Sequence, residues 1–299
     1  MSLISPREVL RQLAEALPAE VRANILVIGS LAAGYHYFER RPEWLVQTKD
    51  VDCMLSPHVK AMSVGQAVTN RLMDAGWQPK PQGRWNQPGD AATPEEELPA
   101  VRLLPPASVD WNLELMNAPR STKDRGRERS RLHTRHGDFV IFSFGFLALA
   151  EEEPLMTEFG IAIARPEMMA LANLLHHRTL GPEQMSGEIE GRRIKRANKD
   201  LGRVLALAYL ASREDENALP GWAKSWEKAL RSRFPRDWKE LAIHAGDGLR
   251  LLLDSEQDLE EAHHTVVTGL LASTRVDLRM LRIMGERLMQ DAVEPLGAR

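Results

Sequence analysis

Two aspartates two residues apart are the strongest candidates for chemistry in this sequence. Asp50 and Asp52 stand in Asp-Val-Asp-Cys-Met-Leu, where polar and apolar residues begin by alternating, and this predicts a strand. Side chains two apart on a strand point to the same face, and two carboxylates there repel each other unless a cation lies between them. Carboxylate oxygens suit Mg²⁺, which often keeps water and substrate phosphate in its shell. The competing interpretation is a solvated strand face with Lys49 as a partner.

Gly29 and Ser30 could hold a phosphate. They follow a short β-branched run at residues 25–28 and precede a predicted helix over residues 31–40. Glycine permits a tight turn and a close approach of phosphate. Backbone N–H groups at a helix N-terminus favour anions, and the Ser30 hydroxyl adds a donor. A Gly-Ser turn that only caps the helix is the alternative.

A third carboxylate comes from residues 108–116, which also alternate. Asp110 and Glu114 share one face of this predicted strand. Their Cα atoms would lie roughly 13 Å apart, so only one of them can meet the first aspartate pair, and alternation does not choose between them. Three carboxylates can hold two metals, one that activates a hydroxyl and one that grips a triphosphate.

Further elements must position these residues. The other predicted elements are helices over residues 6–17 and 59–74 and strands over residues 101–104, 139–142 and 159–163. Residues 78–99 are rich in Pro, Gly, Gln and Glu and predict a long loop. After Pro166 nearly all of the sequence favours helix. We therefore expect an α+β domain over residues 1–165 and a helical domain over residues 166–299.

The order of these features resembles the DNA polymerase β-like nucleotidyltransferase superfamily: an apolar strand, Gly-Ser, a helix, Asp-Val-Asp on a strand and a later strand aspartate. In the second half, three segments are similar to the helical part of abortive-infection type nucleotidyltransferase toxins and their uncharacterised relatives: Arg165-Pro166-Glu167, His176-His177-Arg178 and Lys199-Asp200-Leu201. The resemblance covers roughly residues 20–210. It implies a nucleotidyltransferase-like mixed sheet with helices, followed by the helical domain.

The resemblance also implies a function. The chain would move a nucleotidyl group from an NTP to RNA, a protein or a small molecule, with Mg²⁺ or Mn²⁺, and an antitoxin-like protein would be a partner. The implied site residues are Asp50, Asp52 and Asp110 for catalysis and metal binding, with Asp110 as third carboxylate and base, and Gly29, Ser30 and Lys199 for nucleotide binding.

Two departures from the family pattern favour an alternative, a non-catalytic binding or interaction module of the same fold. Ser30 and Asp50 are separated by 19 residues, which is more than the compact family spacing. Relatives often carry a lysine on the helix after Pro-Glu, where this chain has Ala172-Asn173. Lys199 is the candidate that would compensate.

Residues 119–137 form a basic segment. Seven Arg and Lys side chains against two acidic ones give it a net charge of +5. We expect it near the mouth of the site, where it would bind a polyanionic acceptor such as RNA. A solvated charged surface is the alternative, both here and for a second basic cluster at residues 192–199.

The composition is that of an ordinary globular protein. The chain has 299 residues, of which 43% are hydrophobic and 27% charged, and a net charge of -3, which gives no global sign of nucleic-acid binding. Its one cysteine, Cys53, excludes an internal disulfide and fits a reducing compartment, and alternation points it into the core. No apolar run approaches the roughly 18 residues of a membrane span. We therefore expect a cytoplasmic protein.

Overall fold

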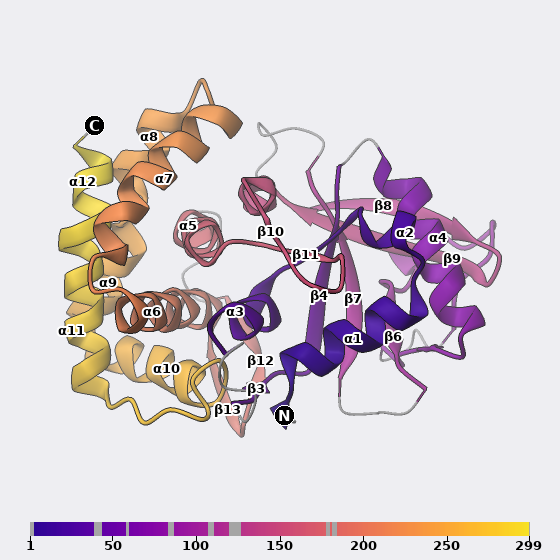
Figure 1. Cartoon of the computed structure of the whole chain (residues 1–299), viewed down its shortest axis with the longest axis horizontal. Coiled ribbons are helices and arrows are strands. Elements are labelled where there is room, and N and C mark those ends of the chain that lie inside the picture. Colours follow the sequence, from indigo (N-terminus) through magenta and orange to yellow (C-terminus); the bar gives the residue numbers. More distant parts are fainter. Residues whose placement is uncertain are drawn as a thin grey trace. The chain divides into compact units, whose positions relative to one another are not determined.

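The computed structural model (Figure 1) describes residues 3–38, 44–57, 60–82, 87–106, 111–119, 127–177, 180 and 184–298. The chain forms two compact units. The sheet unit comprises Ser2–Ala32 and Thr48–Ala164, and the helical unit comprises Met1, Ala33–Gln47 and Arg165–Arg299. The helical unit thus includes a segment from the N-terminal part of the sequence.

In the described part of the sheet unit, nine strands form one mixed sheet. Seven follow the order β10-β11-β2-β4-β7-β6-β5, and β9 pairs with β7 and with β8. β4 runs antiparallel to β2 and parallel to β7. The strands are β2 Ile25–Val27, β4 Asp50–Leu55, β5 Gln78–Pro79, β6 Arg102–Leu104, β7 Asn112–Asn117, β8 Arg127–Thr134, β9 Gly137–Phe144, β10 Leu155–Met156 and β11 Ala162–Ile163. This mixed sheet with helices confirms the expected α+β class.

The remaining elements that begin in the sheet unit are β1 Leu3–Ile4, α1 Pro6–Ala16, α2 Ala19–Arg22, α3 Gly29–Phe38, α4 Ala61–Asp74 and two 3-10 segments, Glu95–Glu97 and Gly145–Glu151. Helix α1 begins where the sequence predicts, because the Ser5 hydroxyl accepts a hydrogen bond from the Glu8 N–H and Pro6 fits the first turn. Helix α3 begins at Gly29, two residues earlier than expected.

Helix α4 packs on one face of the sheet. A Cβ added to Gly65 of α4 would lie 2.9 Å from Leu55 Cδ1 of β4 and 3.2 Å from Leu132 Cδ1 of β8, so the helix approaches these strands closely. Val51, Cys53 and Leu55 share this face and are fully buried. Cys53 is therefore a core residue, as expected, and burial raises the pKa of its thiol. Alternation directs the intervening β4 side chains, among them both aspartates, to the opposite face.

The helical unit is organised around one long helix. Its elements are β3 Val46–Gln47, α5 Pro166–His176, β12 Met185–Ile189, β13 Arg192–Lys195, α6 Arg196–Glu214, α7 Ala218–Arg233, α8 Trp238–His244, α9 Asp247–Asp254, α10 Glu256–Val267, α11 Leu278–Leu288, a π-helical turn Met289–Val293 and α12 Glu294–Gly297. Helix α6 packs against α5, α7, α9, α10 and α11. Its buried apolar stripe includes Leu201, Val204, Leu205 and Ala208.

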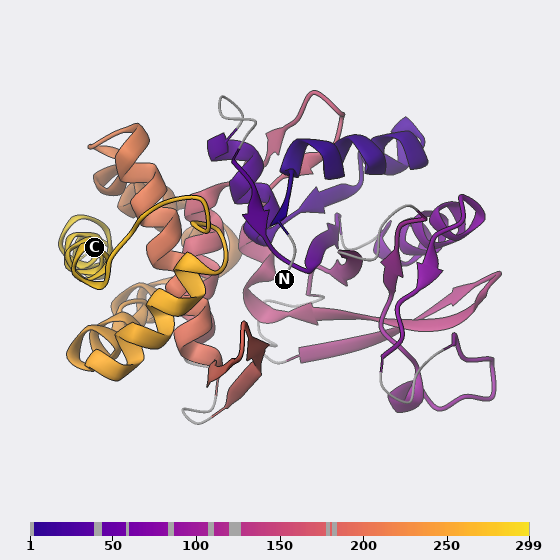
Figure 2. The same ribbon diagram turned by 90° about the horizontal axis from the view of Figure 1, so that it is seen from below.

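The expectation of helix over nearly all of this region is wrong at β12 and β13, which form an antiparallel hairpin (Figure 2). Glu190 and Gly191 connect the strands, and both have positive φ, 44° and 80°, as the tightest hairpin turns require. Ile189 and Ile194 supply the buried apolar side chains of the hairpin. Two apolar residues are too few to produce a visible strand periodicity, which explains the wrong prediction.

The basic segment also contains a strand that the sequence did not predict. β8 pairs with β9 along its whole length, from Arg127 opposite Phe144 to Thr134 opposite Gly137. Among the β8 side chains that the structure describes, only Leu132 is fully buried, so the strand resembles a charged loop in the sequence. In the described part of the chain, no helix is long and apolar enough to cross a membrane.

Candidate active site

Three neighbouring strands bring polar side chains to one face of the sheet. Asp50 and Asp52 alternate with buried residues along β4, and the parallel strand β7 places Asn112 opposite Asp50 and Glu114 opposite Asp52. Antiparallel β6 then places Arg102 opposite Glu114. Because residues in register on adjacent strands point to the same face, these five side chains share the face away from α4. Asp50 is exposed and Asp52 is partly buried.

Gly29 lies directly against the Asp52 carboxylate. Gly29 has φ +73°, and a Cβ at this position would lie 3.0 Å from Asp52 Oδ2. The Ile28 N–H donates a 2.9 Å hydrogen bond to the Asp52 carbonyl, which fixes the end of β2 beside β4. Helix α3 begins at Gly29, so the carboxylate lies at a helix N-terminus, where negative charge is stabilised. Ser30 follows in the first turn and is partly buried.

Glu114 is held by Arg102. The guanidinium donates two hydrogen bonds, Nε to Oε2 at 2.9 Å and Nη2 to Oε1 at 3.0 Å, in the bidentate geometry that suits a carboxylate. Burial opposes the charged form of Arg102, but its hydrogen bonds to Glu114 and the charges of Glu114, Asp50 and Asp52 raise its pKa. Arg102 therefore lies within electrostatic reach of both aspartates while it neutralises Glu114.

Lys80 forms an ion pair with Asp50. Its Nζ lies 3.7 Å from Asp50 Oδ1 and donates a hydrogen bond to Asn112 Oδ1. The backbone N–H of Lys80 donates to the Arg102 carbonyl at 2.8 Å, which fixes the residue just after β5. The sequence suggested Lys49 as the partner of Asp50, and the structure instead gives it Lys80. A tertiary contact between distant strands explains why spacing alone did not reveal it.

The predicted third carboxylate, Asp110, lies outside the described residues, so the choice between Asp110 and Glu114 stays a prediction. In the described part of the chain, no group of three or more His, Cys, Asp or Glu side chains could hold a metal ion. Asp50 and Asp52 nevertheless supply hard oxygen donors on one face, and the absence of a side chain at Gly29 lets the Asp52 carboxylate lie against the start of α3. This donor set fits Mg²⁺, which is often bound by one or two carboxylates together with phosphate oxygens and water.

Lys199 belongs to the helical unit, where it is partly buried in α6, and its nucleotide-binding role stays a prediction. The next residue, Asp200, is almost completely buried, and its Oδ2 lies 3.2 Å from His176 Nδ1 and forms an ion pair with Arg196 Nε at 3.2 Å. Burial opposes ionisation of Asp200, but His176, Arg196 and Arg203 outweigh it and hold its pKa at about 2. His176 and Asp200, which belong to two of the segments that resemble the toxin family, thus lie in one cluster with Arg196 and Arg203.

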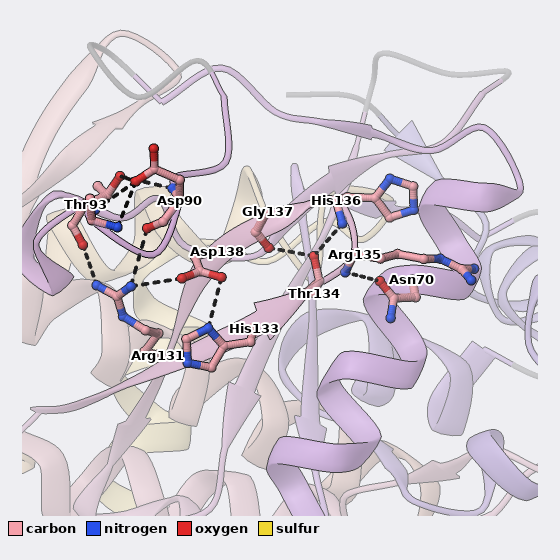
Figure 3. Close-up of polar contacts among 11 residues, drawn as sticks. Asn70, Asp90, Thr93, Arg131, His133, Thr134, Arg135, His136, Gly137 and Asp138 are labelled. Carbon is pink, nitrogen blue, oxygen red and sulfur yellow. Dashed lines mark hydrogen bonds and ion pairs between the residues drawn. The ribbon is translucent and has the colours of Figure 1, made fainter.

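Arg131 of the basic segment is bound within the sheet unit. Figure 3 shows its guanidinium between Asp138 of β9 and the loop that carries Asp90 and Thr93. It forms an ion pair with Asp138 at 2.8 Å and donates to the carbonyls of Asp90 and Thr93. The His133 ring lies 3.0 Å from the other Asp138 oxygen. We call these five residues the Asp138 cluster.

Two other cations of the segment also make intramolecular contacts. Arg129 lies over the Phe142 ring, 5.4 Å from its centroid, and Arg135 forms an ion pair with Asp74 of α4. Residues 120–126 and the side chain of Arg127 lie outside the described residues. The expectation that the segment lies at the mouth of the site and binds a polyanion therefore stays a prediction.

Sequence reasoning missed Lys80, Arg102 and Asn112. Arg102 carried a signal, because it is the one polar residue in Val-Arg-Leu-Leu and strand alternation places it opposite the core. The other two depend on which strands are neighbours. The chain matches no family model, no curated protein and no solved structure. The resemblance to nucleotidyltransferases therefore rests on the sequence features alone.

Proposed function

We propose that the chain is a metal-dependent nucleotidyltransferase, which moves a nucleotidyl group from an NTP to RNA, a protein or a small molecule. The observation that carries the proposal is the position of the Asp52 carboxylate against Gly29 at the start of α3, with Asp50 on the same face. A phosphate-compatible helix terminus and a pair of metal-compatible carboxylates thus adjoin each other.

In the proposed reaction, an acceptor hydroxyl oxygen forms a bond to the α-phosphorus of the NTP. The bond from the α-phosphorus to the bridging oxygen breaks, and pyrophosphate leaves with the electron pair. A basic residue takes the hydroxyl proton, and by the family resemblance this base is Asp110. Gly29 and Ser30 hold the triphosphate, and Lys199 is proposed as a further nucleotide contact. A bound Mg²⁺ or Mn²⁺ supplies neutralisation of the triphosphate charge, and Asp50 and Asp52 orient it.

A second candidate function is a non-catalytic binding module with the same fold. It is favoured by the ion pairs of Asp50 with Lys80 and of Glu114 with Arg102, which neutralise acidic side chains without any metal. In the active site of a metal-dependent nucleotidyltransferase we expect the carboxylates to be available to the metal ion. An antitoxin-like partner and an RNA acceptor are further proposals from the resemblance.

The test uses each NTP labelled at its α-phosphate. It measures transfer of the label to cell RNA and to protein extract in the presence of Mg²⁺. We expect the Asp50→Asn/Asp52→Asn variant to lose at least about two orders of magnitude in rate, since electrostatic stabilisation of that size is typical for such groups. Glu96→Gln/Glu97→Gln is the matched control, because it removes two exposed carboxylates from the same unit. Transfer at the parental rate in the first variant would refute the site.

A further inference from the structure

The Lys80 ammonium lies beside the Asp50 carboxylate, where a divalent ion would also bind. The ammonium lies 3.7 Å from Asp50 Oδ1, on the sheet face that carries Asp52 and the register partner Asn112. Both side chains of the ion pair are partly open to solvent, 33% exposed for Lys80 and 48% for Asp50. The pair is therefore accessible and not locked into the core, in contrast to the Asp138 cluster.

Asn112 provides an independent sign that the arrangement around Lys80 is incomplete. Its side chain is fully buried, and Oδ1 accepts the hydrogen bond from Lys80. In the described part of the chain its Nδ2 has no hydrogen-bond partner. A buried donor without a partner costs free energy, so a native protein usually supplies an acceptor, which can be a bound oxygen-rich ligand.

We propose that the Lys80 ammonium pairs with the Asp50 carboxylate in the metal-free protein and competes with a divalent ion for that carboxylate. The ammonium balances Asp50 while the site holds no metal. When the ion binds Asp50 and Asp52, Lys80 leaves Asp50 and keeps its hydrogen bond to Asn112, which anchors it nearby. This inference rests on the proposed metal site and adds a residue that sets how tightly metal binds.

The competition has a measurable consequence. Two unit charges about 4 Å apart in a largely aqueous environment interact strongly enough to change an affinity by about fivefold. Removing the ammonium should therefore tighten metal binding by about fivefold or more. A merely structural lysine would give the opposite result, because its loss would loosen the strands that hold the ligands.

The experiment titrates Mn²⁺ alone, without nucleotide, into the full chain and follows free Mn²⁺ by electron paramagnetic resonance. Lys80→Met removes the charge and keeps the apolar stem, Lys80→Gln is a second neutral variant, and Lys80→Arg keeps the charge. Lys49→Met is the matched control, because it removes an exposed positive charge next to Asp50 in sequence. Urea denaturation verifies that each variant is folded.

We expect tighter Mn²⁺ binding for Lys80→Met or Lys80→Gln and parental binding for Lys80→Arg and Lys49→Met. Equal or weaker binding in folded neutral variants, or equal tightening in Lys49→Met, would overturn the inference and leave the proposed function standing. The Asp50→Asn/Asp52→Asn variant separates the two. If it binds Mn²⁺ as the parent does, the metal site itself is wrong, and the role of Lys80 falls with it.

Discussion

The Asp138 cluster and the Asp50/Asp52 face both set carboxylates among cations on the same sheet, yet their surroundings differ. The Asp138 side chain is 9% exposed, and each of its oxygens has a cationic or imidazole partner within 3.0 Å. The loop with Asp90 and Thr93 closes over it by accepting hydrogen bonds from Arg131 (Figure 3). Asp50 is 48% exposed, and its cation stands 3.7 Å away.

The difference separates a structural carboxylate from a ligand-ready one. A buried, fully paired carboxylate cannot bind a ligand without exposing unpaired charges, so its ion pairs hold the fold together. An exposed carboxylate with a loose partner contributes little to stability and can exchange that partner for another cation. The exposure of a carboxylate and its distance from the paired cation therefore say more about its function than its presence in a charged cluster does.

The largest loss of stability is expected when Asp138 is replaced. Asp138→Ala leaves the largely buried Arg131 without its carboxylate, and we expect the free energy of unfolding to fall by about 3 kcal/mol. Asp50→Ala should change it by no more than about 0.5 kcal/mol, because exposed pairs contribute little. Urea denaturation of both variants measures the two values. Similar losses in the two variants would remove the distinction.

Asp200 in the helical unit is a second buried and paired carboxylate, and it should make the stability of the protein depend on pH. Its folded pKa of about 2 lies below the ordinary value of about 4 for an unfolded chain, so the folded state favours the charged form. The resulting stability is fully present above about pH 4 and is lost as the pH falls from 4 towards 2, with a total of about 2 kcal/mol. Unfolding free energies at pH 5, 4 and 3 measure this loss, and Asp200→Asn should flatten the slope. An unchanged slope in that variant would assign the effect to other groups.

A smaller effect is expected at Arg102, which lies between the two classes. Arg102→Met leaves Glu114, 13% exposed at its side chain, without its bidentate donor, and we expect a loss of about 1.5 kcal/mol in unfolding free energy. The Arg102→Met/Glu114→Gln double variant should recover part of that loss, since it removes the uncompensated charge. Strictly additive losses would show that the ion pair contributes no coupling.

Local patterns predicted much of the fold. Alternation in Asp50–Leu55 predicted β4 with its bounds, and the period of Val9, Leu10 and Leu13 predicted α1, because each pattern is complete within one element. β8 and the β12–β13 hairpin escaped prediction, since each contains very few buried apolar residues. Their pairing comes from hydrogen bonds to a partner strand, which leave little trace in composition.

Only part of the candidate site, Gly29 and the two aspartates, was predictable from the sequence. Gly29 beside Asp52 follows from an apolar strand that ends next to β4, and the residue types drew attention to both positions. Lys80 and Arg102 reach the acidic face only because β6 lies beside β7 and β5 lies beside β6 in the sheet order. That order is a tertiary property, so neither ion pair was visible from spacing.

Calorimetric titration of NTP with and without Mg²⁺ shows whether the Asp50/Asp52 face binds a nucleotide. We expect metal-dependent NTP binding in the parent chain and in Glu96→Gln/Glu97→Gln, and its loss in Asp50→Asn/Asp52→Asn. Asp50 is exposed and Asp52 partly buried, so that variant should remain folded, which its urea midpoint verifies. Metal-dependent NTP binding that is unchanged in the folded Asp50→Asn/Asp52→Asn variant would contradict the assignment of this face as a nucleotide site.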